Sequence, residues 1–128
     1  MNAITPTAAE LAILRVLWRS GPCTVRDVHA AVYGDTRIGY TSALKLMQNM
    51  LAKDLVTRTE DARQHVYAAA VSERRTLNRV VSGWMDNVFD GSSLALAMQA
   101  LDARPVGADE LAELKAVIRK LERGQGKS

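Results

Sequence analysis

The chain has 128 residues, of which 48% are hydrophobic and 24% are charged, a composition typical of a folded domain. No apolar run approaches the roughly 18 residues of a membrane span, and the first residues lack the basic-then-apolar pattern of a secretion signal. The single cysteine, Cys23, excludes a disulfide bond within the chain. We therefore expect a cytoplasmic protein without membrane contact.

The net charge of +3 is unevenly distributed along the chain. Residues 1–79 carry eleven Lys and Arg against seven Asp and Glu, whereas residues 80–128 carry six against seven. A basic first part favours a polyanionic partner such as DNA, and the nearly neutral second part suggests a different task.

Two capping boxes predict the first two helices. Thr7 and Glu10 have the spacing in which each side chain caps the backbone of the other, and a helix should follow to about residue 19. Thr24 and Asp27 repeat the pattern and predict a shorter second helix, which ends near residues 33–35. The expected inner face of the first helix consists of Leu11, Leu14, Leu17 and Trp18.

A third helix is predicted from about Tyr40 to Asp54, because its apolar and polar residues separate onto two sides at 100° per residue. The polar side contains no acidic residue. Its amides and hydroxyls can hydrogen bond to base edges or phosphates in the major groove of DNA, and its lysine can contact either. The candidate major-groove residues are Thr41, Ser42, Lys45, Gln48 and Asn49.

Two strands at residues 55–60 and 65–69, around the polar turn 61–64, predict a β-hairpin. A winged helix-turn-helix has three helices followed by a hairpin, and the predicted elements have this order. The predicted fold class is therefore mainly α with a small β-hairpin (α+β). The hairpin is then the wing, and basic side chains on or beside it are candidates for phosphate contacts. These residues are Lys53, Arg58 and Arg63.

Three further helices are predicted at about residues 72–89, 94–101 and 109–123. Each helix carries a stripe of apolar residues, and this part of the chain is too small to bury them all. Pairing with a second copy of the chain would bury them. We therefore divide the chain into a winged-helix DNA-binding domain, 1–71, and a helical dimerisation region, 72–128. The predicted interface residues are Leu77, Val81, Trp84, Val88, Leu111, Leu114, Ile118 and Leu121.

The sequence offers no catalytic or metal-binding constellation. We find no nucleophile–base pair, no phosphate-cradling glycine loop and no paired catalytic carboxylates. His29 and His65 are too few and too scattered for a metal site, and Cys23 lies before a helix cap, where a small buried residue is expected. We therefore predict neither an enzyme nor a cofactor.

Several segments together resemble the penicillinase-repressor family (BlaI/MecI type). The segments are 7–18, 24–28, 39–44 (Gly-Tyr-Thr-Ser-Ala-Leu), 53–56 and 89–92, and the resemblance spans about residues 6–123. It implies a homodimer joined by its C-terminal helices, with each winged helix on one half of an inverted-repeat DNA operator. It also implies repression by occupying a promoter, and release by a regulatory protease that acts on the C-terminal region.

The chain departs from the family pattern at a few positions. Many members carry a basic residue at the position of Asn49, and glycine is usual at that of Asp54. Ala97 and Met98 lie near the scissile bond of better-studied members, without the asparagine found there. The cysteine cluster of copper-responsive relatives is absent.

The sequence thus predicts a homodimeric transcriptional repressor that controls β-lactam resistance or related genes. One alternative is a winged-helix module that binds a protein partner. Another is a ligand-sensing repressor with a pocket near Trp84 and Met85 at the dimer seam.

Overall fold

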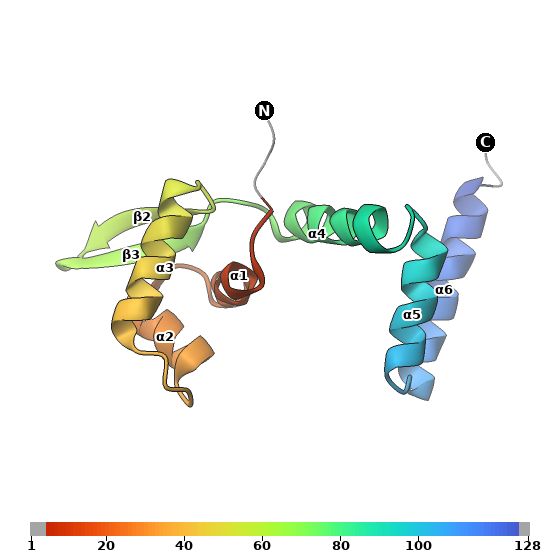
Figure 1. Ribbon diagram of the computed structural model, residues 1–128, viewed down its shortest axis with the longest axis horizontal. Coiled ribbons are helices and arrows are strands. Elements are labelled where there is room, and N and C mark those ends of the chain that lie inside the picture. The colour runs from red at the N-terminus through yellow and green to blue at the C-terminus, as the bar shows by residue number, and fades with distance from the viewer. Residues whose placement is uncertain (1–4, 126–128) are drawn as a thin grey trace. The chain divides into compact units, whose positions relative to one another are not determined.

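The computed structural model describes residues 5–125, and six helices and three strands lie in this part of the chain (Figure 1). They are α1 (Ala8–Ser20), β1 (Cys23–Thr24), α2 (Val25–Tyr33), α3 (Tyr40–Ala52), β2 (Val56–Asp61), β3 (Gln64–Ala69), α4 (Glu73–Val88), α5 (Ser93–Ala103) and α6 (Ala108–Gln125). Contacts divide the chain into two compact units, residues 1–83 and 84–128. The predicted fold class, mainly α with a small β-hairpin, is confirmed, and the hairpin belongs to a three-stranded sheet.

Both predicted capping boxes form. The Thr7 hydroxyl accepts a hydrogen bond from the backbone N–H of Glu10 at 3.2 Å, and the Glu10 carboxylate accepts one from the N–H of Thr7 at 2.9 Å. Thr24 and Asp27 make the same two bonds, each at 3.2 Å. These reciprocal bonds fix where α1 and α2 begin.

The sheet of the first unit has three antiparallel strands in the order β1-β3-β2. β1 was not predicted, because a strand of two residues has no periodicity of its own. It exists through its partner β3, where Cys23 lies opposite Tyr67 and Thr24 lies opposite Val66.

The turn of the hairpin is tighter than predicted, because β2 runs to Asp61 and β3 starts at Gln64. Only Ala62 and Arg63 remain between the strands, with positive φ angles of 50° and 69°. Two successive positive φ angles are the signature of a type I′ turn, whose twist matches that of the flanking strands. The turn therefore holds Arg63 at the tip of the wing.

One hydrophobic core lies among α1, α2, α3 and the sheet. Its fully buried side chains include Ile13, Leu14, Val28, Met47, Met50 and Tyr67. Leu14 and Leu17 were predicted to face inward and are buried, whereas Ile13 was missed. Leu11 and Trp18 of the predicted inner face are only half-buried. The core fixes which side of α3 faces outward.

α3 ends two residues earlier than predicted. Lys53 is its C-cap, and Asp54 adopts a positive φ of 61°. This is the region that glycine occupies without strain and that commonly ends helices. The glycine that the family resemblance leads one to expect at Asp54 therefore has a conformational reason.

α4 begins in the first unit, where Thr76 and Val80 are buried, and ends in the second. The break predicted after it is present: the N–H of Gly91 donates a hydrogen bond to the carbonyl of Met85 at 2.7 Å, and Asp90 and Gly91 both have positive φ. Ser92 then caps α5 by accepting from the N–H of Ala95 at 3.0 Å. Among the described residues, none in α5 or α6 is buried.

Candidate nucleic-acid interface

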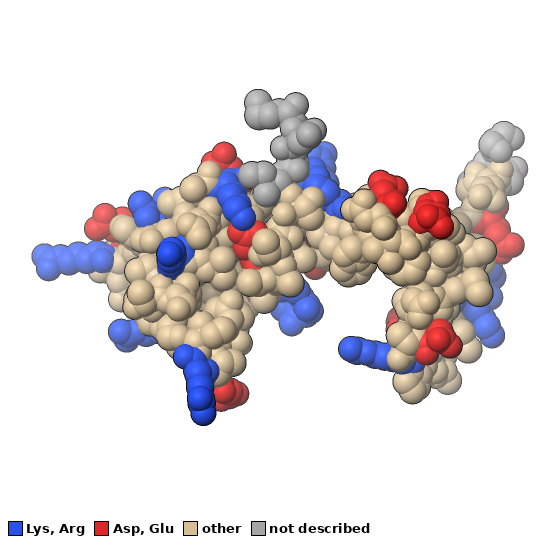
Figure 2. Space-filling view, in the orientation of Figure 1, with Lys and Arg blue, Asp and Glu red and all other residues tan. Residues whose placement is uncertain are grey.

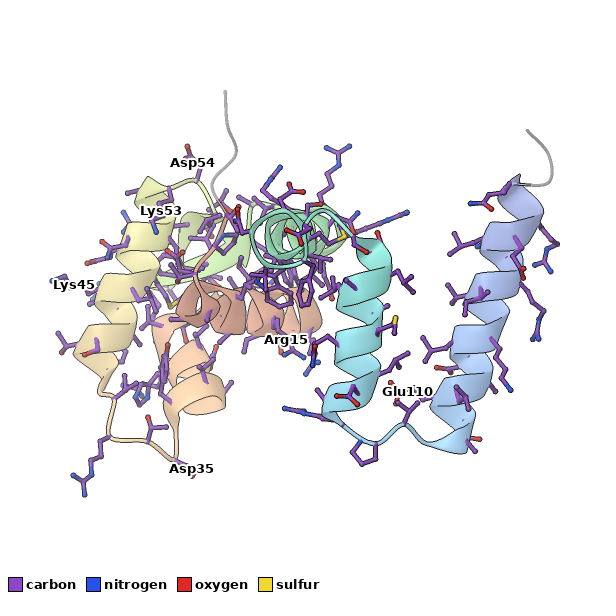
Figure 3. All side chains as sticks on the ribbon, turned by 45° about the vertical axis from the view of Figure 1, so that its right-hand side comes forward. Arg15, Asp35, Lys45, Lys53, Asp54 and Glu110 are labelled. Atoms are coloured by element: carbon purple, nitrogen blue, oxygen red, sulfur yellow. The ribbon has the colours of Figure 1, made fainter. Side chains whose placement is uncertain are left out.

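The outward side of α3 carries the predicted major-groove residues. All five of them, Thr41, Ser42, Lys45, Gln48 and Asn49, are exposed. On the other side of the helix Ala43, Met47 and Met50 are buried in the core. Figure 3 shows Lys45 on the side of α3 that faces away from α1 and α2. The structure thus brings the five polar side chains onto one solvent-facing surface.

The start of α3 leaves backbone donors uncapped. Its N-cap is Gly39, which has no side chain to accept a hydrogen bond from the first turn. The preceding loop is held in place by His29, whose Nε2 lies 2.7 Å from the carbonyl oxygen of Ile38. Free N–H groups beside the hydroxyls of Thr41 and Ser42 are suited to a phosphate.

The wing carries its basic residues at exposed positions. Arg58 lies on β2 and Arg63 in the turn. Glu60 and Asp61 lie near the same tip and weaken its attraction for an anion. Figure 2 shows Lys and Arg side chains spread over the surface around α3 and the hairpin, with fewer acidic side chains between them.

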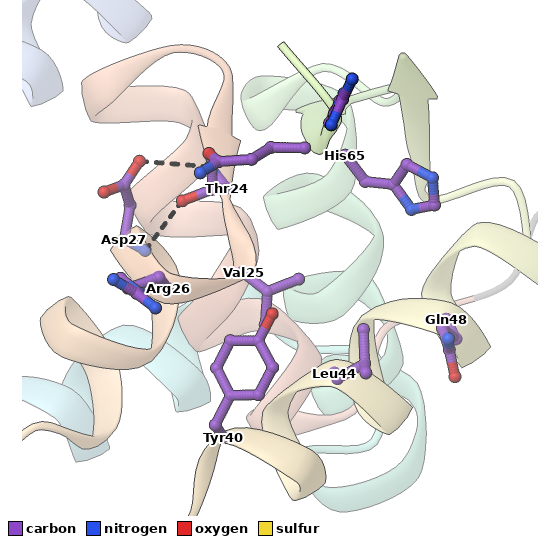
Figure 4. A pocket seen from close by; sticks show the side chains of 10 residues that line it. Thr24, Val25, Arg26, Asp27, Tyr40, Leu44, Gln48 and His65 are labelled. Carbon is purple, nitrogen blue, oxygen red and sulfur yellow. Dashed lines mark hydrogen bonds between the residues drawn. The ribbon is translucent and has the colours of Figure 1, made fainter. Parts of the chain in front are cut away.

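A groove of about 550 Å³ lies between α2, α3 and the wing (Figure 4). Its lining residues are Thr24, Val25, Arg26, Asp27, Tyr40, Leu44, Gln48, Arg63, Gln64 and His65. The one carboxylate among them, that of Asp27, is engaged with the backbone N–H of Thr24. Figure 4 shows the Tyr40 ring directed into the groove toward Val25. The groove therefore combines basic and amide groups with an apolar floor.

Sequence reasoning missed four polar residues of this groove: Arg26, Tyr40, Gln64 and His65. They come from three separate elements, so no spacing in the sequence indicates that they meet. Tyr40, half-exposed at the start of α3, lies within the segment 39–44 and could have been noticed there.

Lys53 is engaged within the protein. Its Nζ donates a hydrogen bond to Oε2 of Glu10 at 2.7 Å, and Glu10 is only 1% exposed. Burial raises the pKa of Glu10, but the hydrogen bonds from Lys53 and Thr7 and the charge of Lys53 outweigh it, so the pKa lies below its ordinary value of 4.5. The phosphate contact predicted for Lys53 competes with this ion pair and stays a prediction.

The predicted interface residues of the second unit are exposed in the single chain. They are Trp84 (54%), Val88 (67%), Leu111 (44%), Ile118 (56%) and Leu121 (64%), with Leu114 partly buried. Leu94, Met98, Leu101 and Val117 are also exposed and were missed. Leu77 and Val81 lie in the first unit. An apolar surface of this kind is expected to be covered by a partner.

Three other features of the described part of the chain bear on its function: possible metal-ligand clusters, possible membrane-spanning helices and the cysteine. Within residues 5–125 no group of three or more His, Cys, Asp or Glu could hold a metal ion, and no helix is long and apolar enough to cross a membrane. Cys23 is buried as expected, and burial, together with the nearby charge of Asp27, raises the pKa of its thiol. A raised pKa makes the thiol a poor nucleophile.

Three helices followed by a hairpin, with the third helix exposing a polar face free of acids, are the arrangement of a winged-helix DNA-binding protein. The model of the family described as penicillinase repressor matches residues 6–120, and the chain belongs to this family. The family resemblance predicted from the sequence is therefore confirmed. The family consists of transcriptional regulators rather than enzymes.

The curated relatives agree with this family assignment, and a solved structure shares the fold. The chain is 31% identical over 118 residues to the transcriptional regulator BlaI from two strains of Mycobacterium tuberculosis, with 91% of this chain and 85% of the relative covered. It is also similar in fold to a mutant MarR of E. coli complexed with operator DNA. That match has a TM-score of 0.53 and 14% identity, and covers 91% of this chain and 75% of the other.

Proposed function

We propose that the protein is a sequence-specific transcriptional repressor that binds an inverted-repeat operator as a homodimer. In this proposal α3 enters the major groove and reads bases with Lys45, Gln48 and Asn49, while Thr41 and Ser42 sit at its start. Arg58 and Arg63 of the wing contact phosphates. The observation that carries the proposal is the exposed, acid-free outward face of α3 beside a wing that exposes Arg58 and Arg63.

The groove between α2, α3 and the wing supports the same proposal. The backbone of a DNA strand that borders the major groove would run from α3 toward the wing along this protein groove. There Arg26 and Arg63 offer positive charge and Tyr40 offers a hydroxyl. Phosphate contacts of this kind position α3 without reading sequence. These phosphate contacts would increase the affinity for DNA of any sequence.

The dimer is supported by the exposed apolar side chains of α5 and α6. Helices that bury none of their residues gain little from folding alone, so their stability should come from a second copy. A two-fold dimer places its two α3 helices on two half-sites related by the same symmetry. Bound over a promoter, it would exclude RNA polymerase.

The family description and the BlaI relatives support genes of β-lactam resistance, or related genes, as the targets. Release of repression by a regulatory protease would require cleavage near Ala97 and Met98. Met98 is 61% exposed on α5, but the asparagine of better-studied relatives is missing there. A cleavage assay on the purified protein separates this route from release by a ligand.

The test of the proposal is selection of genomic fragments by the purified protein, followed by titration of the best fragment across salt concentrations. We expect an enriched two-fold repeat with half-sites about one helical turn apart, or a multiple of it, and a steep loss of affinity with salt. No enriched motif, with weak and salt-insensitive binding, would contradict the proposal and favour a protein partner for the winged helix.

A further inference from the structure

Both carboxylate oxygens of Glu10 are used, and they serve different purposes. Oε1 accepts the N–H of Thr7 and completes the cap of α1, whereas Oε2 accepts Nζ of Lys53, 43 residues further along the chain. The first bond is local and any capping glutamate could make it. The second joins the start of α1 to the end of α3.

Lys53 is held at both its backbone and its side chain. As the C-cap of α3, its N–H donates to the carbonyl of Asn49 at 3.1 Å. Its ammonium is anchored on Glu10. The last turn of α3, which carries Asn49 on its outward side, is therefore fixed against α1.

Only one partner of this ion pair is buried: the Glu10 side chain is 1% exposed, whereas that of Lys53 is 37% exposed. Such a pair contributes little net stability but resists displacement. Removing a carboxylate from water is costly, and the attraction of one partner mainly offsets that cost. Once buried, however, Glu10 has no described partner for Oε2 except Lys53, so a shift of α3 along its axis would leave a buried charge without its partner. Such a constraint matters most where hydrogen bonds to base edges need correct distance and angle.

We propose that Glu10 and Lys53 are positioning residues that set the place of α3 for reading DNA, and that Lys53 makes no phosphate contact. This inference rests on the proposed function. It assigns an indirect role in DNA reading to Glu10, an acidic residue on α1 that lies outside the surface that meets DNA in the proposal.

The two roles of Lys53 differ in how binding depends on salt and sequence. A lost phosphate contact weakens binding to all DNA equally and lowers the salt slope by about 0.9. A misplaced reading helix weakens binding to the operator, leaves binding to unrelated DNA almost unchanged and keeps the slope. Lys53→Met removes the ammonium but retains most of the stem, and Arg58→Met is the matched control at a predicted phosphate contact.

We would measure operator and unrelated-DNA affinity across salt concentrations, at a temperature where circular dichroism shows each variant fully folded. We expect Lys53→Met and Glu10→Gln each to lose roughly 10-fold on the operator, the scale of one misplaced base contact, with the wild-type salt slope. Lys53→Arg should restore part of the loss. The double variant should be no worse than either single variant, because both act through one pair.

A fall of the salt slope in Lys53→Met, like that of Arg58→Met, would overturn the inference. So would wild-type operator affinity in folded Glu10→Gln, a variant that keeps an oxygen for the Thr7 cap and remains informative if Lys53→Met does not fold. Failure of the wild-type protein to select any DNA would instead overturn the proposed function, and the inference with it.

Discussion

The indole Nε1 of Trp18 donates a hydrogen bond to the carbonyl oxygen of Val71 at 3.0 Å, across 53 residues of the chain. Trp18 lies near the end of α1, and Val71 lies between β3 and α4, packed against the core. The bond therefore ties the exit of the wing to the first helix. It occurs at the point where the chain leaves the sheet for α4.

We expect Trp18→Phe to lower the free energy of unfolding by about 1–3 kcal/mol, because the Val71 carbonyl loses its donor and the core loses part of a ring. Urea unfolding followed by circular dichroism measures the change. Trp84→Phe is the comparison: Trp84 is 54% exposed and belongs to the predicted interface, so its substitution should weaken dimerisation instead. Equal stability of wild type and Trp18→Phe would show that this bond is dispensable.

The pH dependence of stability should contain a contribution from Glu10. Its pKa in the folded protein lies below the ordinary value of 4.5, so the unfolded chain binds this proton more tightly than the folded one does. The contribution is fully present above the ordinary pKa and is lost as the pH falls through the folded-state pKa. We expect the stability of the wild type to fall more steeply with acidification below about pH 5 than that of Glu10→Gln. Parallel curves in urea unfolding would contradict this.

The apolar stripe of α6 offers a direct test of the dimer. Ile118→Asp places a charge on that stripe and should raise the dimer dissociation constant roughly 100-fold or more. Ala116→Asp is the matched control, because it adds the same charge on the opposite side of the same helix at 100° per residue. Sedimentation equilibrium measures the dimer dissociation constant of both variants. A monomer produced equally by both variants would point to loss of the helix rather than of an interface.

Base-reading and phosphate-binding side chains should separate in binding experiments. Gln48→Ala should relax sequence preference by about 1–3 kcal/mol, whereas Arg58→Ala should weaken binding to every DNA and lower the salt slope by about one. Lys45→Ala then shows which kind of contact Lys45 makes. If Gln48→Ala lost affinity equally on operator and unrelated DNA, Gln48 would be removed from the reading residues.

The tip of the wing allows stability and binding to be changed in opposite directions. Arg63 has a φ of 69°, so Arg63→Gly should relieve backbone strain and raise stability by up to about 1 kcal/mol while weakening DNA binding. Ala62→Asn, at a φ of 50°, should also favour the turn but leave affinity unchanged. Thermal unfolding and DNA titration of the two variants check this. Unchanged affinity in Arg63→Gly would remove Arg63 from the phosphate contacts.

The features that could be predicted from the sequence are those with local causes. The capping pairs Thr7–Glu10 and Thr24–Asp27 lie three residues apart, and the two faces of α3 repeat with the period of a helix. Signals of this kind involve only residues close together in the chain, so they are sufficient to predict the helices, the hairpin and the outward face of α3.

The features that could not be predicted depend on residues far apart in the chain. β1 exists only through its pairing with β3, and the ion pair of Glu10 with Lys53 requires α1 and α3 to be packed together. The groove likewise joins Arg26 of α2 to His65 of the wing. Each becomes visible only when the core has placed these elements side by side.

The central claim, that two copies read a two-fold repeat through α3, is tested most directly by the stoichiometry of binding to the selected operator and to one half-site. We predict two chains on the intact repeat, and markedly weaker binding to the isolated half-site. One chain on each fragment, with equal affinity for repeat and half-site, would contradict the claim.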